Sequence, residues 1–129
     1  MDRRIEQAQQ LFWEVGRLRD EGLHRAALPR LVKMAGLHEE RALELLGNRA
    51  ADGWADLYAA ITAWGEAGHR GDAERLVAVG RRRSALFGEG SQNILCQLDD
   101  LAVWLDSLHI VPSLGDFARP LPAMAPEAA

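Results

Sequence analysis

Residues 54–80, WADLYAAITAWGEAGHRGDAERLVAVG, decide the fold of this chain. Large apolar residues recur in this stretch every three or four positions: Leu57, Ile61, Trp64 and, beyond a glycine, Val77. This spacing is that of one face of an α-helix. Gly68 interrupts the pattern, and a glycine just past a helix end can adopt the left-handed backbone that stops the helix. The stretch therefore predicts two helices, over about 54–67 and 73–87, joined by a tight turn.

The first of these helices is apolar on nearly every side. Its large residues share one side of a helical wheel: Trp54, Leu57, Tyr58, Ile61 and Trp64. Its other side consists of small residues: Ala59, Ala60, Ala63 and Ala67. A helix that is apolar all round is buried on both sides. We therefore expect residues 54–67 to form the central helix, with Trp64 inside the core and the alanine side letting a neighbouring helix approach closely.

Helical spacing extends over the body of the chain, and no segment alternates with the period of two that is typical of a half-buried strand. With glycines as stop signals, the sequence predicts an all-α fold of six helices, over about 3–21, 25–35, 38–47, 54–67, 73–87 and 92–109. Polar residues before the predicted helices are candidate N-caps: Asp2, Asp52, Asp72 and Ser91. The helices are expected to pack as stacked hairpins or as a compact bundle.

The chain divides into a helical-hairpin domain, residues 1–110, and a C-terminal tail, residues 111–129. The full length of 129 residues is that of a single domain. Four of the five prolines lie in the tail. We expect the end of the tail to be disordered, because it is rich in proline and alanine and has few large apolar residues.

The last predicted helix, residues 92–109, has a second apolar strip formed by Cys96 and Val103. A strip of this kind needs a cover. The first part of the tail contains Leu114 and Phe117, which could dock there. A second copy of the chain could cover the strip instead, which would make a homo-oligomer through this helix.

Charge and cysteine content narrow the function classes. There are 19 acidic residues and 15 basic residues, so the net charge is −4, whereas nucleic-acid-binding domains usually carry a basic excess. The single cysteine allows no internal disulfide. The N-terminus lacks the apolar stretch of a signal peptide, and the longest apolar run, residues 57–64, is far shorter than a membrane span of about 20 residues. We expect a cytoplasmic protein with no membrane contact.

The sequence contains an internal repeat. Shifting it by 46 residues aligns the first two predicted helices with residues 54–67 and 73–87. The matched positions are stripe and turn positions: Leu11 with Leu57, Phe12 with Tyr58, Val15 with Ile61, Leu18 with Trp64, Gly22 with Gly68, Ala27 with Ala73, and Leu31 with Val77. Each copy predicts a helical hairpin in which a small alanine lies where the second helix crosses the first.

This hairpin pattern resembles the tetratricopeptide repeat. The copy most similar to that family runs from Leu57 to Gly80. The family's period is about 34 residues, so residues 38–47 would be an insertion, and the proline that usually ends a repeat is missing from both copies. A plain helical bundle with the same kind of hairpin is the alternative.

The resemblance implies a protein that binds other proteins or peptides, because such arrays stack hairpins into a surface lined by their first helices. Carried over to this chain, the groove-facing residues would be Gln9, Phe12, Arg19, Tyr58, Thr62 and Glu66. Trp13 lies off the apolar stripe of its helix and Trp104 lies at the edge of another. An exposed tryptophan is a candidate interface anchor, and burial against a neighbouring element is the alternative for both.

Nothing in the sequence predicts a catalytic centre, a metal site or a cofactor. The four histidines are not spaced as zinc ligands with one another or with the cysteine: His24, His38, His69 and His109. The adjacent carboxylates Glu39–Glu40 and Asp99–Asp100 point about 100° apart on a helix, so neither pair converges. No glycine-rich phosphate loop follows a strand. We therefore expect no enzymatic activity.

The basic residues of the helix predicted over 73–87 support one alternative function. Arg75, Arg81 and Arg82 could hold an acidic partner or a nucleic acid. Arg83 lies on the apolar stripe of the same helix, and we expect it to form an ion pair with Asp99 or Asp100. The favoured function is a protein-interaction module, acting as an adaptor, a regulator or a chaperone. The alternative is a helical protein associated with nucleic acid.

Overall fold

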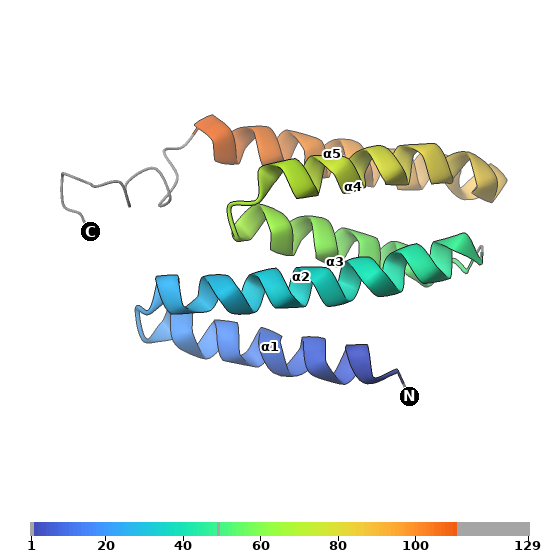
Figure 1. Cartoon of the computed structure of the whole chain (residues 1–129). Coiled ribbons are helices and arrows are strands. Elements are labelled where there is room, and N and C mark those ends of the chain that lie inside the picture. The colour runs from blue at the N-terminus through green and yellow to red at the C-terminus, as the bar shows by residue number, and fades with distance from the viewer. Residues whose placement is uncertain (1, 49, 111–129) are drawn as a thin grey trace.

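The computed structural model describes residues 2–48 and 50–110, and these residues are almost entirely helical. The expectations for the tail, including docking of Leu114 and Phe117, concern residues outside this part of the chain. Five α-helices and one short 3-10 segment follow one another (Figure 1): α1 Arg3–Asp20, α2 His24–Gly47, α3 Gly53–Glu66, α4 Arg70–Ser84, η1 Ala85–Gly90 and α5 Ser91–Ile110. None of these described helices combines the length and the apolar character that crossing a membrane requires.

Each helix packs against the next one in the chain, and α3 lies in the middle, between α2 on one side and α4 with α5 on the other (Figure 1). One buried cluster joins α3 to α4, α5 and the C-terminal half of α2. A second cluster joins α1 to the N-terminal half of α2 and reaches α3 at Ala63. The prediction that residues 54–67 form the central helix is thus confirmed.

Trp64 connects the two clusters, because its side chain packs against both. It is half-buried rather than fully enclosed as expected. The reason is its polar edge: Nε1 donates a hydrogen bond to Oε1 of Glu39 on α2 at 2.9 Å. Most buried tryptophan N–H groups have such a partner, and the partner of Trp64 lies at the edge of the core.

The same turn closes both hairpins, 46 residues apart. Gly22 and Gly68 have left-handed φ angles of 79° and 84°. The same backbone hydrogen bond of 2.8 Å spans each turn: Leu23 N–H to the Leu18 carbonyl, and His69 N–H to the Trp64 carbonyl. Ala27 and Ala73, at the predicted crossing points, are both fully buried. The chain is therefore built from sequential hairpins, and the first two share their turn geometry.

One predicted break is wrong: residues 25–35 and 38–47 belong to a single helix, α2, so there are five α-helices rather than six among the described residues. The sequence predicts a helix stop at Gly36, but Gly36 is not one of the glycines with a left-handed backbone. The buried stripe continues past it: Leu31, Met34, Ala35, Ala42 and Leu46. Packing of this stripe against α1 and α3 outweighs the weak local preference of one glycine.

Replacing Gly36 with alanine is expected to stabilise the protein. No atom of the surrounding side chains lies within 4 Å of a Cβ placed at Gly36. Alanine is better than glycine in a helix interior by about 1 kcal/mol, which should raise the melting temperature by about 4 °C. Thermal unfolding followed by circular dichroism measures this. Gly68→Ala is the control with the opposite sign, because its φ of 84° is unfavourable for alanine. A lower melting temperature for Gly36→Ala would contradict the prediction.

The predicted N-caps have different outcomes. Asp2 caps α1, accepting a hydrogen bond from the Arg4 N–H at 2.9 Å. Hydrogen bonds from the Arg4 side chain and backbone hold the pKa of the Asp2 carboxyl well below its usual range. The Asp2 carboxylate therefore stabilises the folded state above that range, and this stabilisation is lost as the pH falls below it. Asp52 has a helical backbone and makes no cap bond. Asp72 lies in the first turn of α4, and Ser91 is the first residue of α5.

Candidate binding groove

A groove of about 1130 Å³ runs between α1 and α3, with α2 as its floor. The first helices of the two hairpins thus form its two walls. Its lining includes all seven residues that the sequence suggested for partner binding: Gln9, Phe12, Trp13, Arg19, Tyr58, Thr62 and Glu66. Residues from two elements that are far apart in the sequence are therefore brought together in one place.

The wall on α1 is a helix face adjacent to the buried one. The buried face packs on α2 through Ala8, Leu11, Val15 and Leu18. The groove face consists of positions three or four apart: Ile5, Gln9, Phe12, Gly16 and Arg19. Phe12 and Trp13 are 63% and 74% exposed, and their rings meet edge to face at a centroid distance of 6.4 Å. The wall therefore presents two large aromatic side chains to solvent.

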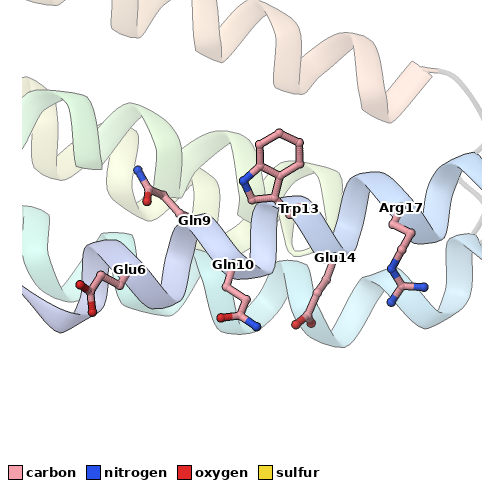
Figure 2. A pocket seen from close by; sticks show the side chains of 6 residues that line it. All are labelled: Glu6, Gln9, Gln10, Trp13, Glu14 and Arg17. Atoms are coloured by element: carbon pink, nitrogen blue, oxygen red, sulfur yellow. The ribbon is translucent and has the colours of Figure 1, made fainter.

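Trp13 lies at the border between the groove and the outer surface of α1. A shallower hollow on that outer surface is lined by α1 alone. Figure 2 shows Gln9 and Trp13 projecting from one side of the helix, whereas Gln10 and Glu14 project from another. With only one helix lining it, this hollow has no opposite wall, so the groove between α1 and α3 is the stronger candidate site.

The two candidate tryptophans have different environments. Trp104 is half-buried on α5, and its ring would be only 2.7 Å from a Cβ placed at Gly65 of α3. Trp104 therefore packs against the central helix, so the alternative of burial against a neighbouring element applies to it. Trp13 remains as the exposed tryptophan of the pair.

The wall on α3 is formed mainly by small and neutral residues. Ala55, Ala59 and Ala63 line it together with Tyr58 and Thr62. The Thr62 hydroxyl donates a hydrogen bond to the Tyr58 carbonyl at 2.9 Å. Burial raises the pKa of the Tyr58 phenol above its ordinary value, so Tyr58 is neutral at physiological pH. The central part of this wall therefore carries no charge.

An ion pair lies across one end of the groove. Arg19 of α1 and Glu66 of α3 approach to 3.3 Å. Both side chains are more than one-third exposed, so the pair contributes little to stability. The ion pair links the two walls and makes this end of the groove polar.

A buried polar cluster forms the other end. Asp56 of α3 is only 6% exposed. It accepts a hydrogen bond of 2.9 Å involving His38 Nδ1 and another from the Arg41 guanidinium, both on α2. The Nε atom of Arg41 is also 3.4 Å from the Asp2 carboxylate. This cluster links the N-terminal ends of α1 and α3 to α2.

This cluster was not predicted from the sequence, and Asp56 was not among the candidate residues. A usable signal was its place between Trp54 and Leu57, at the start of a helix predicted to be buried on both sides. A carboxylate there needs a partner. Which residues supply it depends on how α2 packs against α3, which helical spacing alone does not give.

The cluster has some features of a catalytic site but lacks others. A carboxylate bonded to one histidine nitrogen is the arrangement that orients a general base. Among the described residues, no hydroxyl or thiol is hydrogen-bonded to His38. In the same part of the chain, no three His, Cys, Asp or Glu side chains gather as metal ligands. The geometry is that of a buried ion pair.

The arginines suggested for an acidic partner or nucleic acid are largely paired within the chain. Arg75 is 2.9 Å from Glu39 and 3.2 Å from Asp72. Arg81 is 2.9 Å from Asp99, so Arg81 forms the ion pair that was expected of Arg83. These carboxylates reduce the positive potential that a phosphate backbone would need.

Arg83 itself is half-buried near the C-terminal end of α2 and, among the described residues, has no carboxylate within ion-pair distance. Its Nη1 atom lies 3.8 Å from a Cβ placed at Gly47, the last residue of α2. A cation near a helix C-terminus interacts favourably with the helix dipole. The half-buried charge of Arg83 is thus placed near the C-terminus of α2, whereas the sequence predicted a carboxylate as its partner.

Cys96 and Val103 are both exposed on α5, and Val103 is 68% exposed. The strip predicted from the sequence is therefore present, and no described segment covers it.

Comparison with family models, with curated proteins and with solved structures finds no match to this chain. The described residues form an all-helical protein of five α-helices packed as sequential hairpins.

Proposed function

We propose that this chain is a binding module, rather than an enzyme, and that it holds a segment of a partner protein in the groove between α1 and α3. The observation that carries this proposal is the pair of exposed aromatic side chains, Phe12 and Trp13, at the wall of a groove. Large apolar side chains that remain exposed next to a concave surface are typical of interaction sites.

The energetics favour a partner at this position. Burying one large apolar side chain contributes about 1.5–3 kcal/mol before the costs of association. Phe12 and Trp13 together can therefore supply a substantial part of the binding free energy. The two ends of the groove are polar, and each carries an ion pair within the chain. The uncharged central part is where apolar side chains of a partner would be buried.

The positions of α1 and α3 also support a proposal that this chain binds its partner as tetratricopeptide-like proteins do. In such arrays the first helices of successive hairpins line the binding surface, and α1 and α3 occupy that position here. On this basis the protein would act as an adaptor, a regulator or a chaperone for its partner.

Affinity purification from a cell lysate tests the proposal. The bait is the tagged chain, compared with a Phe12→Ala/Trp13→Ala double variant and with Leu86→Ala. Leu86 is also an exposed large apolar residue, but it lies in η1 and does not line the groove. We expect a set of proteins that the unmodified chain and Leu86→Ala recover equally and that the double variant loses by about tenfold or more. If the double variant recovers the same set, the groove is not the binding site.

A further inference from the structure

Gly16 gives the groove wall on α1 a gap. It lies in the middle of the helix, is exposed, and has no atom within 4 Å of a Cβ placed on it. Three other helical glycines are explained by close packing, with neighbouring atoms at 2.7–2.9 Å from such a Cβ: Gly53, Gly65 and Gly80. Gly36 is open like Gly16, but it does not line the groove. Gly16 therefore leaves backbone accessible from the groove.

The opposite wall also has small side chains. On α3 the small residues Ala55, Ala59 and Ala63 face the groove. This chain uses the same kind of surface where its own helices cross, with Gly65 under Trp104 and Gly80 under Leu57 and Leu98. Small residues at a crossing let two helix backbones come close together. The groove is therefore lined by small residues of the kind that this chain has at its own helix crossings.

The polar groups of the groove favour a helix over an extended segment. Between the two charged ends, the lining offers only Gln9, Trp13, Tyr58 and Thr62 as side chains with polar atoms. An extended segment would bring one N–H and one C=O per residue that need partners. A helix satisfies these groups internally. The wall from Ile5 to Arg19 is about 21 Å long at 1.5 Å per residue, which corresponds to about four helical turns.

The end of the groove near Asp52 is acidic. Asp56 lines the groove there and pairs with Arg41, which also contacts Asp2. Behind this end, outside the groove lining, Asp2, Glu40 and Glu44 share a single arginine, Arg4. Asp52 adds a further exposed carboxylate at the rim. Basic side chains and the positive N-terminal end of a helix are both stabilised next to such an excess of negative charge.

We propose that the groove receives an amphipathic α-helix of about four turns, which crosses α1 at Gly16 and places its basic N-terminal end beside Asp52. This inference rests on the proposed function and specifies the partner. The partner helix contributes an apolar stripe with the spacing i, i+3 or i+4, i+7 that packs against Phe12 and the alanine wall. Its lysines or arginines lie near the acidic end.

The test is a selection from a phage library of random peptides of about 18 residues. The unmodified full chain is the target, and Gly16→Leu, which fills the gap in the wall, is used for counter-selection. We expect the selected peptides to share apolar residues at helical spacing and to have basic residues in their N-terminal half. Synthetic copies should become helical on binding, as measured by circular dichroism. A central proline should weaken binding by about tenfold or more.

The matched variants are Gly16→Ala and Gly36→Ala, which add the same methyl group inside and outside the groove. Neither should lower the melting temperature, and only Gly16→Ala should weaken peptide binding. If the selected peptides tolerate the proline, lack helical spacing or have acidic N-terminal halves, the inference is overturned while the groove remains a binding site. An absence of selected peptides, or equal binding to Gly16→Leu, also overturns it. The recovery experiment with the Phe12→Ala/Trp13→Ala variant then decides separately on the proposed function.

Discussion

Leu57→Ala is expected to lower the free energy of unfolding by about 3–4 kcal/mol. The Leu57 side chain is fully buried and belongs to the cluster that joins α3 to α4 and α5. Its Cδ2 atom lies 2.9 Å from a Cβ placed at Gly80, so it packs directly against the backbone of α4. Truncation to alanine leaves a cavity at the point where the central helix meets its neighbour. Urea unfolding followed by circular dichroism at 222 nm measures the loss.

Gly80→Ala provides the partner for a double-mutant cycle with Leu57→Ala. Alone, the added methyl group would meet Leu57 and Leu98 at 2.9 Å, and both side chains are fully buried. In the Leu57→Ala background one of these contacts disappears and the methyl group enters the cavity. The two changes should therefore be less destabilising together than their sum, by about 1 kcal/mol. Strictly additive effects would show that α3 and α4 do not meet at this position.

Local signals made the hairpins predictable. Gly22 and Gly68 follow stretches of helical spacing, and the hydrogen bonds of the turn form within six residues, so neighbouring sequence suffices to specify them. The central position of residues 54–67 was predictable because both sides of that helix are apolar. The groove positions came from the resemblance to the tetratricopeptide repeat, in which the first helices of stacked hairpins line one surface. The shift of 46 residues by itself matches only Phe12 with Tyr58 among them.

Long-range packing could not be predicted in the same way. Whether Gly36 ends a helix depends on the neighbours that bury the residues on either side of it, here α1 and α3. The Asp56 cluster depends on how the part of α2 that carries His38 and Arg41 packs against α3, and helical spacing alone does not give that packing. Whether Arg81 or Arg83 pairs with Asp99 likewise depends on how α5 packs on α4.

Asp56→Asn is expected to lower the free energy of unfolding by about 3 kcal/mol. The substitution preserves the shape of the side chain but removes the charge that faces Arg41, whose side chain is only 20% exposed. The guanidinium would keep a contact of 3.4 Å with Asp2, which already binds Arg4. Asp52→Asn is the matched control, since Asp52 lines the same end of the groove but is exposed. We expect its effect to stay within about 0.5 kcal/mol. Equal losses for the two variants would contradict the prediction.

The double variant Arg41→Met/Asp56→Leu separates the loss of a partner from the value of the pair. Removing one member of a buried ion pair leaves the other charge without compensation, whereas replacing both with apolar residues removes the desolvation cost as well. We therefore expect the double variant to recover most of the 3 kcal/mol, to within about 1 kcal/mol of the unmodified protein. Recovery would mean that the cluster matters less for stability than for keeping charge at the acidic end of the groove. If the double variant is as unstable as Asp56→Asn, the pair with its His38 contact is itself a main support of the α2–α3 junction.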